Sequence, residues 1–307
     1  MSFTGTVKNE ITTLKLTATA KVALLSGFFR NNYQIINNYI TISSENDAVI
    51  AYLKELLDSY EEISYQEELL DNNNFSKNKL KALIITKGND FIKETFCIED
   101  YIVPNYIVEL DDEIRGYLRG VFLSSGSIND PKTSRYHLEF LIEKGEEAVF
   151  VQKLLNNYSL NVKLLSRDKG FMLYVKEAEK ISDFLKIVGA SKAVLYYEEI
   201  RVYRDTKNKT NRLNNCEQAN MDRVLETAME QLKYIRILED NLAIELLDDK
   251  TKEALEYRKK YQEASLKELS EIISLETGKK ITKSGLNHRF RKIKELALKF
   301  SNNKTSR

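Results

Sequence analysis

Two stretches of this chain repeat one another, and the repeat restricts the fold more than any other feature. Leu25–Tyr33 and Leu118–Gly126 each begin with an apolar helical run, carry a glycine at the third position and end in polar residues before a turn. Their first residues lie 93 positions apart in the sequence. That period is too long for a solenoid, whose repeats span roughly 20–50 residues. It predicts the duplication of a half-domain.

The sequence that follows each stretch repeats as well. In the first half an Asn37-Asn38 turn joins two short strand patterns, and in the second half a turn at Asp130-Pro131 precedes a strand. Each half then gives helical and strand patterns in the order helix, hairpin, helix, hairpin, helix. We therefore expect a duplicated α+β domain over residues 1–200, with its halves at about 1–100 and 101–200.

A glycine inside an apolar helix requires a packing reason, because it costs about 1 kcal/mol relative to alanine there. Gly27 and Gly120 occupy the same position of the two repeats. Close contact between two helix backbones is such a reason. We expect the two helices to cross near these glycines and to form the interface between the half-domains.

The paired stretches resemble the nine-residue signatures of LAGLIDADG homing endonucleases, which implies a pseudo-two-fold α+β saddle. Those enzymes carry an acid at the eighth signature position, and the two acids together bring metal ions to the scissile phosphates. Here the eighth positions are Asn32 and Ser125, which are neutral and are weak ligands for a divalent metal. Nuclease activity and a bound metal are therefore not expected, although Asp130 and Glu139 are the nearest acids that could substitute.

Composition excludes several other classes of protein. The chain has 42% hydrophobic and 30% charged residues and no apolar run long enough for a membrane span, and its first residues do not resemble a signal peptide. Two cysteines are too few for a disulfide framework or a four-cysteine zinc site. With two histidines, no nucleophile-and-base pattern and no phosphate-binding glycine loop, neither catalysis nor a cofactor or small-molecule substrate is indicated. We expect a cytoplasmic protein.

The net charge of +1 conceals a strong asymmetry along the chain. Residues 1–200 contain 23 Lys and Arg against 29 Asp and Glu, whereas residues 201–307 contain 24 against 17. From Lys279 to Arg307 there are ten basic residues and one acid, Glu295. Such a tail favours a polyanion as partner, and it predicts that nucleic acid is bound at the C-terminal end of the chain.

Residues 201–216 have no clear periodicity and collect basic and asparagine residues, so we expect a basic linker or exposed loop there. It is either a solvated connector or an arm that contacts phosphates. A helical domain at 217–307 should follow. Within it, Ser265-Leu266-Lys267-Glu268 is a capping box, which predicts the start of a short helix.

A second helix should begin after Thr282, with Leu286, Phe290, Ile293 and Ala297 as its buried stripe. The two helices predict a helix-turn-helix motif at about 265–299, with a turn of about eight residues from Ser274 to Ile281. A basic helical hairpin with a solvated face is the alternative interpretation.

In a helix-turn-helix, the N-terminal part of the second helix enters the major groove of DNA. The exposed face of this helix supplies candidates for contacts to base edges: Ser284, Asn287, His288 and Arg291. The surrounding cations are better placed for phosphates: Lys279, Lys280, Lys283, Arg289, Lys292 and Lys294. His288 is interpreted as a phosphate or solvent contact rather than as a metal ligand.

Degenerate LAGLIDADG repeats followed by such a motif resemble one family over essentially the whole chain, the bacterial WhiA proteins. Several strings in order carry this resemblance: Ser2-Phe3 with Val7-Lys8 and Glu10; Arg115-Gly116-Tyr117-Leu118-Arg119-Gly120; Asn129-Asp130-Pro131 with Tyr136-His137-Leu138-Glu139; Asn211-Arg212-Leu213 with Asn215-Cys216-Glu217; and Lys283-Ser284-Gly285-Leu286-Asn287-His288-Arg289.

The resemblance implies a non-catalytic, sequence-specific DNA-binding regulator of transcription, associated with the nucleoid and linked to cell division and chromosome segregation, and in some relatives to sporulation. Double-stranded DNA is the expected partner of the C-terminal domain. The N-terminal domain is expected to orient that domain, to add weak DNA contacts or to bind a protein. Two alternatives stay open: an active or relic endonuclease, and a protein-interaction adaptor whose DNA binding is incidental.

Overall fold

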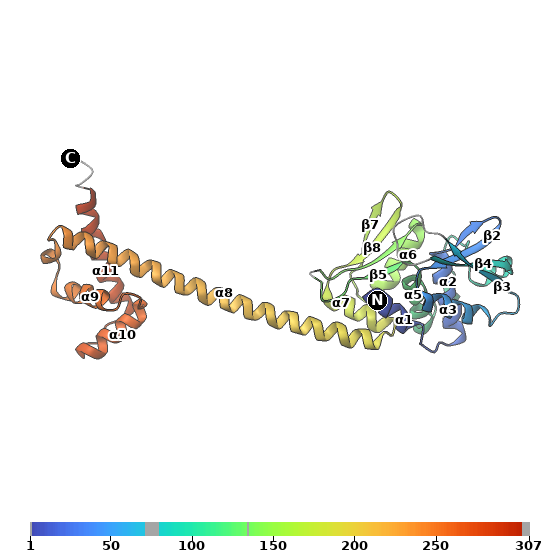
Figure 1. Ribbon diagram of the computed structural model, residues 1–307, viewed down its shortest axis with the longest axis horizontal. Helices are drawn as coiled ribbons and strands as arrows, with labels where there is room; N and C mark the ends of the chain where they lie inside the picture. Colours follow the sequence, from blue (N-terminus) through green and yellow to red (C-terminus); the bar gives the residue numbers. More distant parts are fainter. Residues whose placement is uncertain (1, 71–79, 134, 303–307) are drawn as a thin grey trace. The chain divides into compact units, whose positions relative to one another are not determined.

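The structure is a computed structural model, and it describes residues 2–70, 80–133 and 135–302. Residues 303–307, the end of the expected DNA-binding domain, lie outside the described residues. The chain forms two compact units, Met1–Asp205 and Thr206–Arg307 (Figure 1). Within the described part of the chain, every helix is too short or too polar to cross a membrane.

The first unit begins with helix α1, Phe3–Ile11, which the sequence patterns did not indicate. Two half-domains of the same element order follow. The first contains α2 Ala18–Arg30, β1 Gln34–Ile36, β2 Tyr39–Ser44, α3 Asp47–Leu57, β3 Ser64–Leu70, β4 Leu80–Lys87 and α4 Asn89–Thr95. A 3-10 turn, Asn105–Ile107, leads to the second, which contains α5 Asp111–Ser125, β5 Gly126–Ile128, β6 Leu138–Ile142, α6 Gly145–Asn157, β7 Lys163–Arg167, β8 Gly170–Val175 and α7 Ala178–Ile187.

Each half contains one antiparallel four-stranded sheet, and the two sheets have equivalent strand orders, β1-β2-β4-β3 and β5-β6-β8-β7. The equivalent strand order of the two sheets confirms the predicted duplication and the α+β class. The predicted Asn37-Asn38 turn is also confirmed, because both residues have positive φ and Ile36 pairs with Tyr39 across it. Asparagine tolerates that backbone region better than most residues, which suits it to a tight hairpin.

Helices α2 and α5 pack against each other along the middle of the first unit, and their glycines lie at the contact. A Cβ on Gly27 would overlap the carbonyl oxygen of Tyr117, and one on Gly120 would overlap that of Leu24. Gly116, one turn before Gly120, meets the Ala20 carbonyl oxygen in the same way, with 2.5 Å to a Cβ. The two helix backbones therefore touch directly, and only glycine fits at these positions.

A buried polar network joins the half-domains beside this contact. The Arg30 Nε of α2 donates to Glu147 Oε2 of α6 at 2.7 Å, and the Tyr117 hydroxyl of α5 donates to the other oxygen of the same carboxylate. Arg30 and Glu147 are 7% and 2% exposed. Removing one partner would leave the other charge buried and unpaired, which would destabilise the contact between the two halves.

The second unit contains the later part of α8, Ser191–Asp240, followed by a 3-10 turn, Ile244–Leu246, and by α9 Asp249–Lys260, α10 Leu266–Thr277 and α11 Lys283–Asn302. The linker or loop expected at 201–216 is wrong, because these residues are helical within α8. The segment contains neither glycine nor proline, and every residue from Asp205 to Arg223 is exposed. A helix that is polar on all sides has no hydrophobic period, so its pattern resembles that of a loop.

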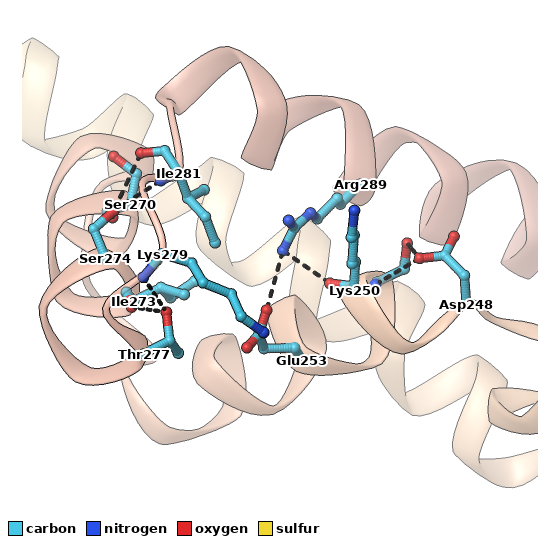
Figure 2. Close-up of polar contacts among 11 residues, drawn as sticks. Asp248, Lys250, Glu253, Ser270, Ile273, Ser274, Thr277, Lys279, Ile281 and Arg289 are labelled. Atoms are coloured by element: carbon cyan, nitrogen blue, oxygen red, sulfur yellow. Dashed lines mark hydrogen bonds and ion pairs between the residues drawn. The ribbon is translucent and has the colours of Figure 1, made fainter.

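The expected eight-residue turn before α11 is also wrong. Helix α10 continues to Thr277, Gly278 follows with a φ of +68°, and α11 begins at Lys283. Polar residues at the end of α10 imitate a loop, yet their hydroxyls bond to the helix itself: Ser274 Oγ donates to the Ser270 carbonyl at 2.6 Å, and Thr277 Oγ1 donates to that of Ile273 at 2.7 Å (Figure 2). The connection, residues 278–282, is close to the usual helix-turn-helix length.

Candidate nucleic-acid interface

Helix α11 has one buried stripe and one exposed face. Leu286, Phe290, Ile293 and Ala297 are at most 4% exposed and pack with residues of α8, α9 and α10 in the core of the second unit. The opposite face carries the four residues expected to contact bases, all of them exposed: Ser284, Asn287, His288 and Arg291. Their side chains make no hydrogen bond or ion pair with the described residues, so they are available to a ligand.

Hydrogen bonds in the turn and at the helix starts hold α10 and α11 together. Ser265 Oγ accepts from the Glu268 amide at 3.2 Å, and Glu268 Oε2 accepts from the Ser265 amide at 2.7 Å, as the capping box predicts. The Ile281 amide donates to Ser274 Oγ at 3.0 Å, which ties the turn to α10 (Figure 2). Thr282 Oγ1 accepts from the Gly285 amide at 3.1 Å and caps the first turn of α11.

The six cations expected to contact phosphates fall into two groups. Lys279 and Lys280 in the turn and Lys283 at the start of α11 are exposed, and their ammonium groups make no contact with an acid of the described residues. The other three are paired within the second unit: Arg289 Nη1 lies 3.4 Å from Glu253, Lys292 Nζ 3.2 Å from Asp248 and Lys294 Nζ 2.7 Å from Glu230.

The paired cations fasten α11 to the helices behind it. Arg289 Nη1 also donates to the Lys250 carbonyl at 2.9 Å, next to its contact with Glu253 (Figure 2). Lys294 shares the Glu230 carboxylate with the Tyr234 hydroxyl, and these bonds lower the pKa of Glu230 and raise that of Lys294. A phosphate would have to displace an acid from these cations. Lys279, Lys280 and Lys283 can bind a phosphate without such a displacement.

The eighth signature positions of the first unit are used within the fold. Asn32 Oδ1 accepts from the Ser43 amide at 2.8 Å, and Ser125 Oγ donates to the Val121 carbonyl at 3.0 Å. Asp130 and Glu139, the acids that could have substituted for them, do not line the cavity beside Asn32, and Glu139 lies 3.0 Å from His137. Within the described residues there is no group of three or more His, Cys, Asp and Glu that could hold a metal ion.

The cavity beside Asn32 has a volume of about 1050 Å³ and is lined mainly by small polar side chains of α1, α3 and the loop before it. Lys8, to which the sequence patterns assigned no function, lies in its wall and donates from Nζ to the Leu123 carbonyl at 2.9 Å. Burial lowers the pKa of Lys8 to about 8. Lys8 therefore lies against the end of α5, in a cavity whose lining also includes Glu45 and Asp47.

Family models of two domains match most of this chain. The WhiA LAGLIDADG-like domain matches residues 114–207, and the WhiA C-terminal HTH domain matches residues 210–297. A probable cell division protein WhiA of Staphylococcus epidermidis is 39% identical over 314 residues, which cover 98% of each chain. One of Bacillus cereus is 37% identical over 309 residues, which cover 97% of each chain.

Two crystal structures share the fold. Full-length DUF199/WhiA from Thermatoga maritima matches with a TM-score of 0.59 and 22% identity over 98% of this chain and 99% of that one. The N-terminal LAGLIDADG domain of DUF199/WhiA matches with a TM-score of 0.51 and 23% identity over 61% of this chain and 90% of that one. With a duplicated α+β domain, a C-terminal helix-turn-helix and relatives of this similarity over nearly its full length, the chain belongs to the WhiA family.

Proposed function

We propose that this protein is a non-catalytic, sequence-specific DNA-binding regulator of transcription that acts in cell division and chromosome segregation. The observation that carries the proposal is the exposed face of α11, whose polar side chains have no partner within the described residues and lie next to three unpaired lysines. Because no other protein group has to be displaced from it, such a face can enter a groove of DNA at little cost.

The residue types on that face suit direct readout. Asn287 can bond to both N6 and N7 of adenine, and Arg291 to O6 and N7 of guanine, while Ser284 and His288 lie beside them. Lys279, Lys280 and Lys283 neutralise phosphates on the flanks of the groove. Arg289, Lys292 and Lys294 contribute less, because each must first exchange a carboxylate for a phosphate.

The cellular role is inferred from the relatives. Those from Staphylococcus epidermidis and Bacillus cereus are named probable cell division proteins, and they match nearly the whole chain. Regulation of transcription and chromosome segregation follow from the WhiA resemblance of the sequence. A DNA-bound regulator would be found in the cytoplasm at the nucleoid.

A second role for the first unit is supported by one exposed apolar segment. Between the half-domains Tyr101, Ile102, Tyr106 and Leu110 are 72%, 69%, 63% and 62% exposed. Exposed apolar residues that cluster in sequence favour a protein partner. We infer that the first unit binds a protein through this segment while the second unit binds DNA.

Selection of duplexes from a random pool with the full chain tests the DNA-binding proposal. A recurring sequence, bound with an affinity that falls steeply with salt, supports it. Salt-insensitive binding, or the recovery of no common sequence, contradicts it. Incubation of the selected duplex with Mg²⁺ tests the endonuclease alternative, because a specific cut that a chelator abolishes would contradict the proposed loss of catalysis at Asn32 and Ser125.

A further inference from the structure

A pocket of about 290 Å³ lies between the helices of the second unit. Its walls come from the middle of α8, the end of α9, the start of α10 and the first residue of α11: Arg223, Val224, Thr227, Arg258, Ser265, Leu266, Lys267 and Lys283. Four of these eight residues are cationic and none is acidic. Among these four cations, the sequence patterns assigned a DNA contact only to Lys283.

Arg258 is the most unusual residue of this pocket, because it is 1% exposed and forms no ion pair with a carboxylate of the described residues. Its Nε donates to Gln231 Oε1 at 2.9 Å, and its Nη1 donates to the Ala264 carbonyl at 2.6 Å. Its guanidinium lies 5.6 Å from the centre of the Phe290 ring. No hydrogen bond joins the remaining nitrogen, Nη2, to the described residues.

A buried cation without a counter-charge is costly, because burial removes water and only partial charges replace it. Burial accordingly lowers the pKa of the Arg258 guanidinium. Arg289 and Lys294, by contrast, each have an acid beside them. An anion in the pocket would offset the cost at Arg258 and would be shared with three further cations.

Glu268, which follows Lys267 in the sequence, does not fill this role. Glu268 accepts from the Ser265 amide and is committed to the capping box of α10. Lys267 has only a long contact to an acid, with 3.9 Å between its Nζ and Glu271, and both side chains are well exposed. Exposed pairs of this kind contribute little, so Lys267 can turn to an anion at small cost.

We propose that this pocket binds a phosphate group of the DNA backbone, held by the Arg258 Nη2 with Arg223, Lys267 and Lys283. The inference rests on the proposed function, since it supplies a backbone contact for the same complex. Lys283 lies one helical turn before Asn287, so the pocket flanks the end of α11 that enters the groove. A phosphate there would fix the register of the recognition helix on the duplex.

The test replaces two of the three exposed cations of the pocket and leaves Lys283 and Arg258 in place, because Arg258 also holds the end of α9. Arg223→Ala combined with Lys267→Ala, in the full chain, should reduce the slope of log K against log salt by about 0.9 on the selected duplex. The matched control is Lys233→Ala combined with Arg236→Ala, which removes the same charge from exposed positions of α8 outside the pocket. The control should leave the slope nearly unchanged.

A duplex series with one neutral methylphosphonate at a time locates the contact. One linkage should weaken binding of the wild-type chain and have no effect on the pocket variant. Equal slopes for the two double variants, with no such linkage, would overturn the pocket assignment and leave the proposed function intact. If the wild-type chain bound no duplex, both the pocket assignment and the proposed function would be contradicted.

Inorganic phosphate distinguishes a free ligand from DNA. If calorimetric titration showed submillimolar binding of phosphate that the pocket variant lost, while both double variants kept the same DNA slope, the pocket would serve a free phosphorylated ligand and the DNA assignment would be wrong. Thermal unfolding of each variant checks that the second unit stays folded.

Discussion

The α2–α5 pair and the α10–α11 pair are both marked by short sequence motifs. The motif lies mostly inside the protein in the first pair, whereas it includes an exposed polar face in the second. In the first pair the apolar part of each motif is buried and the two backbones touch at Gly27 and Gly120. In the second pair one apolar stripe of α11 is buried and its polar face is exposed. A motif that resembles an enzyme signature can thus form a helix contact, while the face that we propose for DNA binding lies on another helix.

The polar residues of the two pairs differ in whether the protein itself already supplies their hydrogen-bond partners. Asn32 and Ser125 are used within the first unit, by the Ser43 amide and the Val121 carbonyl. Asn287 and Arg291 have no partner within the described residues. A polar group that its own fold already satisfies has little left to offer a substrate, whereas an unsatisfied exposed group gains most from a ligand.

The largest effect is expected where the helix backbones touch. In Gly120→Ala the new Cβ would overlap the Leu24 carbonyl oxygen and lie 2.7 Å from the Phe28 nitrogen, so α2 and α5 must separate. We expect the first unit to lose about 3 kcal/mol or more of unfolding free energy. Differential scanning calorimetry of the full chain measures it.

Gly285→Ala is the matched control in α11. The nearest neighbour of the new Cβ would be Thr282 Oγ1, at an ordinary contact distance of 3.4 Å, so the helix should gain up to about 1 kcal/mol. If both substitutions destabilised the chain by similar amounts, close packing of α2 on α5 would not be the reason for Gly120.

Much of the fold could be predicted from the sequence, because the repeat reveals itself through local patterns. The Asn37-Asn38 hairpin and the stripe of α11 depend on residues close in sequence. The α8 segment at 201–216 was misjudged because a helix that is exposed on all sides has no hydrophobic period, and the turn was misjudged because Ser274 and Thr277 bond back to α10.

A change of specificity is the next largest effect. Asn287→Ala should cost roughly 1–3 kcal/mol at one base position and relax the preference there, because a bidentate contact is lost. Binding to a panel of single-base variants of the selected duplex measures it. Lys280→Ala should instead weaken binding to every duplex of the panel alike. A uniform loss for Asn287→Ala would mean that this residue does not read a base.

A smaller effect is expected when the unpaired cations are compared with the acid-paired cations. The two groups should differ in how much their removal reduces the salt dependence of DNA binding. Lys279→Ala with Lys280→Ala should reduce the salt slope by about 1.8, since two unpaired lysines are removed. Lys292→Ala with Lys294→Ala should reduce it by less than half as much, because Asp248 and Glu230 already neutralise them. Fluorescence anisotropy over a salt range of about 50 to 300 mM measures both slopes. Equal reductions for the two pairs would show that the acids behind α11 do not matter.

The candidate site could be only partly predicted from the sequence, because charge pairing is a tertiary property. The spacing of α11 indicates its outer face, but the acids that pair with its flanks come from distant residues, among them Glu230 and Asp248. Arg258 gave no signal at all. One arginine in a charged helix is unremarkable until its burial and its lack of a neighbouring acid among the described residues become visible.

The smallest effect tests the polar end of the α2–α5 pair through Lys8. Its pKa in the folded chain, about 8, lies below the value of an unfolded lysine, so the folded chain releases this proton first. The unfolding free energy should therefore rise as the pH rises from the folded pKa toward the unfolded one, by about 1 kcal/mol once the partial exposure of the side chain is allowed for.

Urea unfolding over this pH range gives the unfolding free energy of the wild-type chain and of Lys8→Met. The difference between the two pH profiles measures the contribution of Lys8. Burial raises the pKa of Cys97, and that of Tyr117 more strongly, so both groups lower stability at high pH, but they do so equally in the two chains and cancel. A profile of the same shape for both chains would place the Lys8 ammonium in water. A rise that only the wild-type chain shows would mean that a poorly solvated cation lies in the cavity beside Asn32.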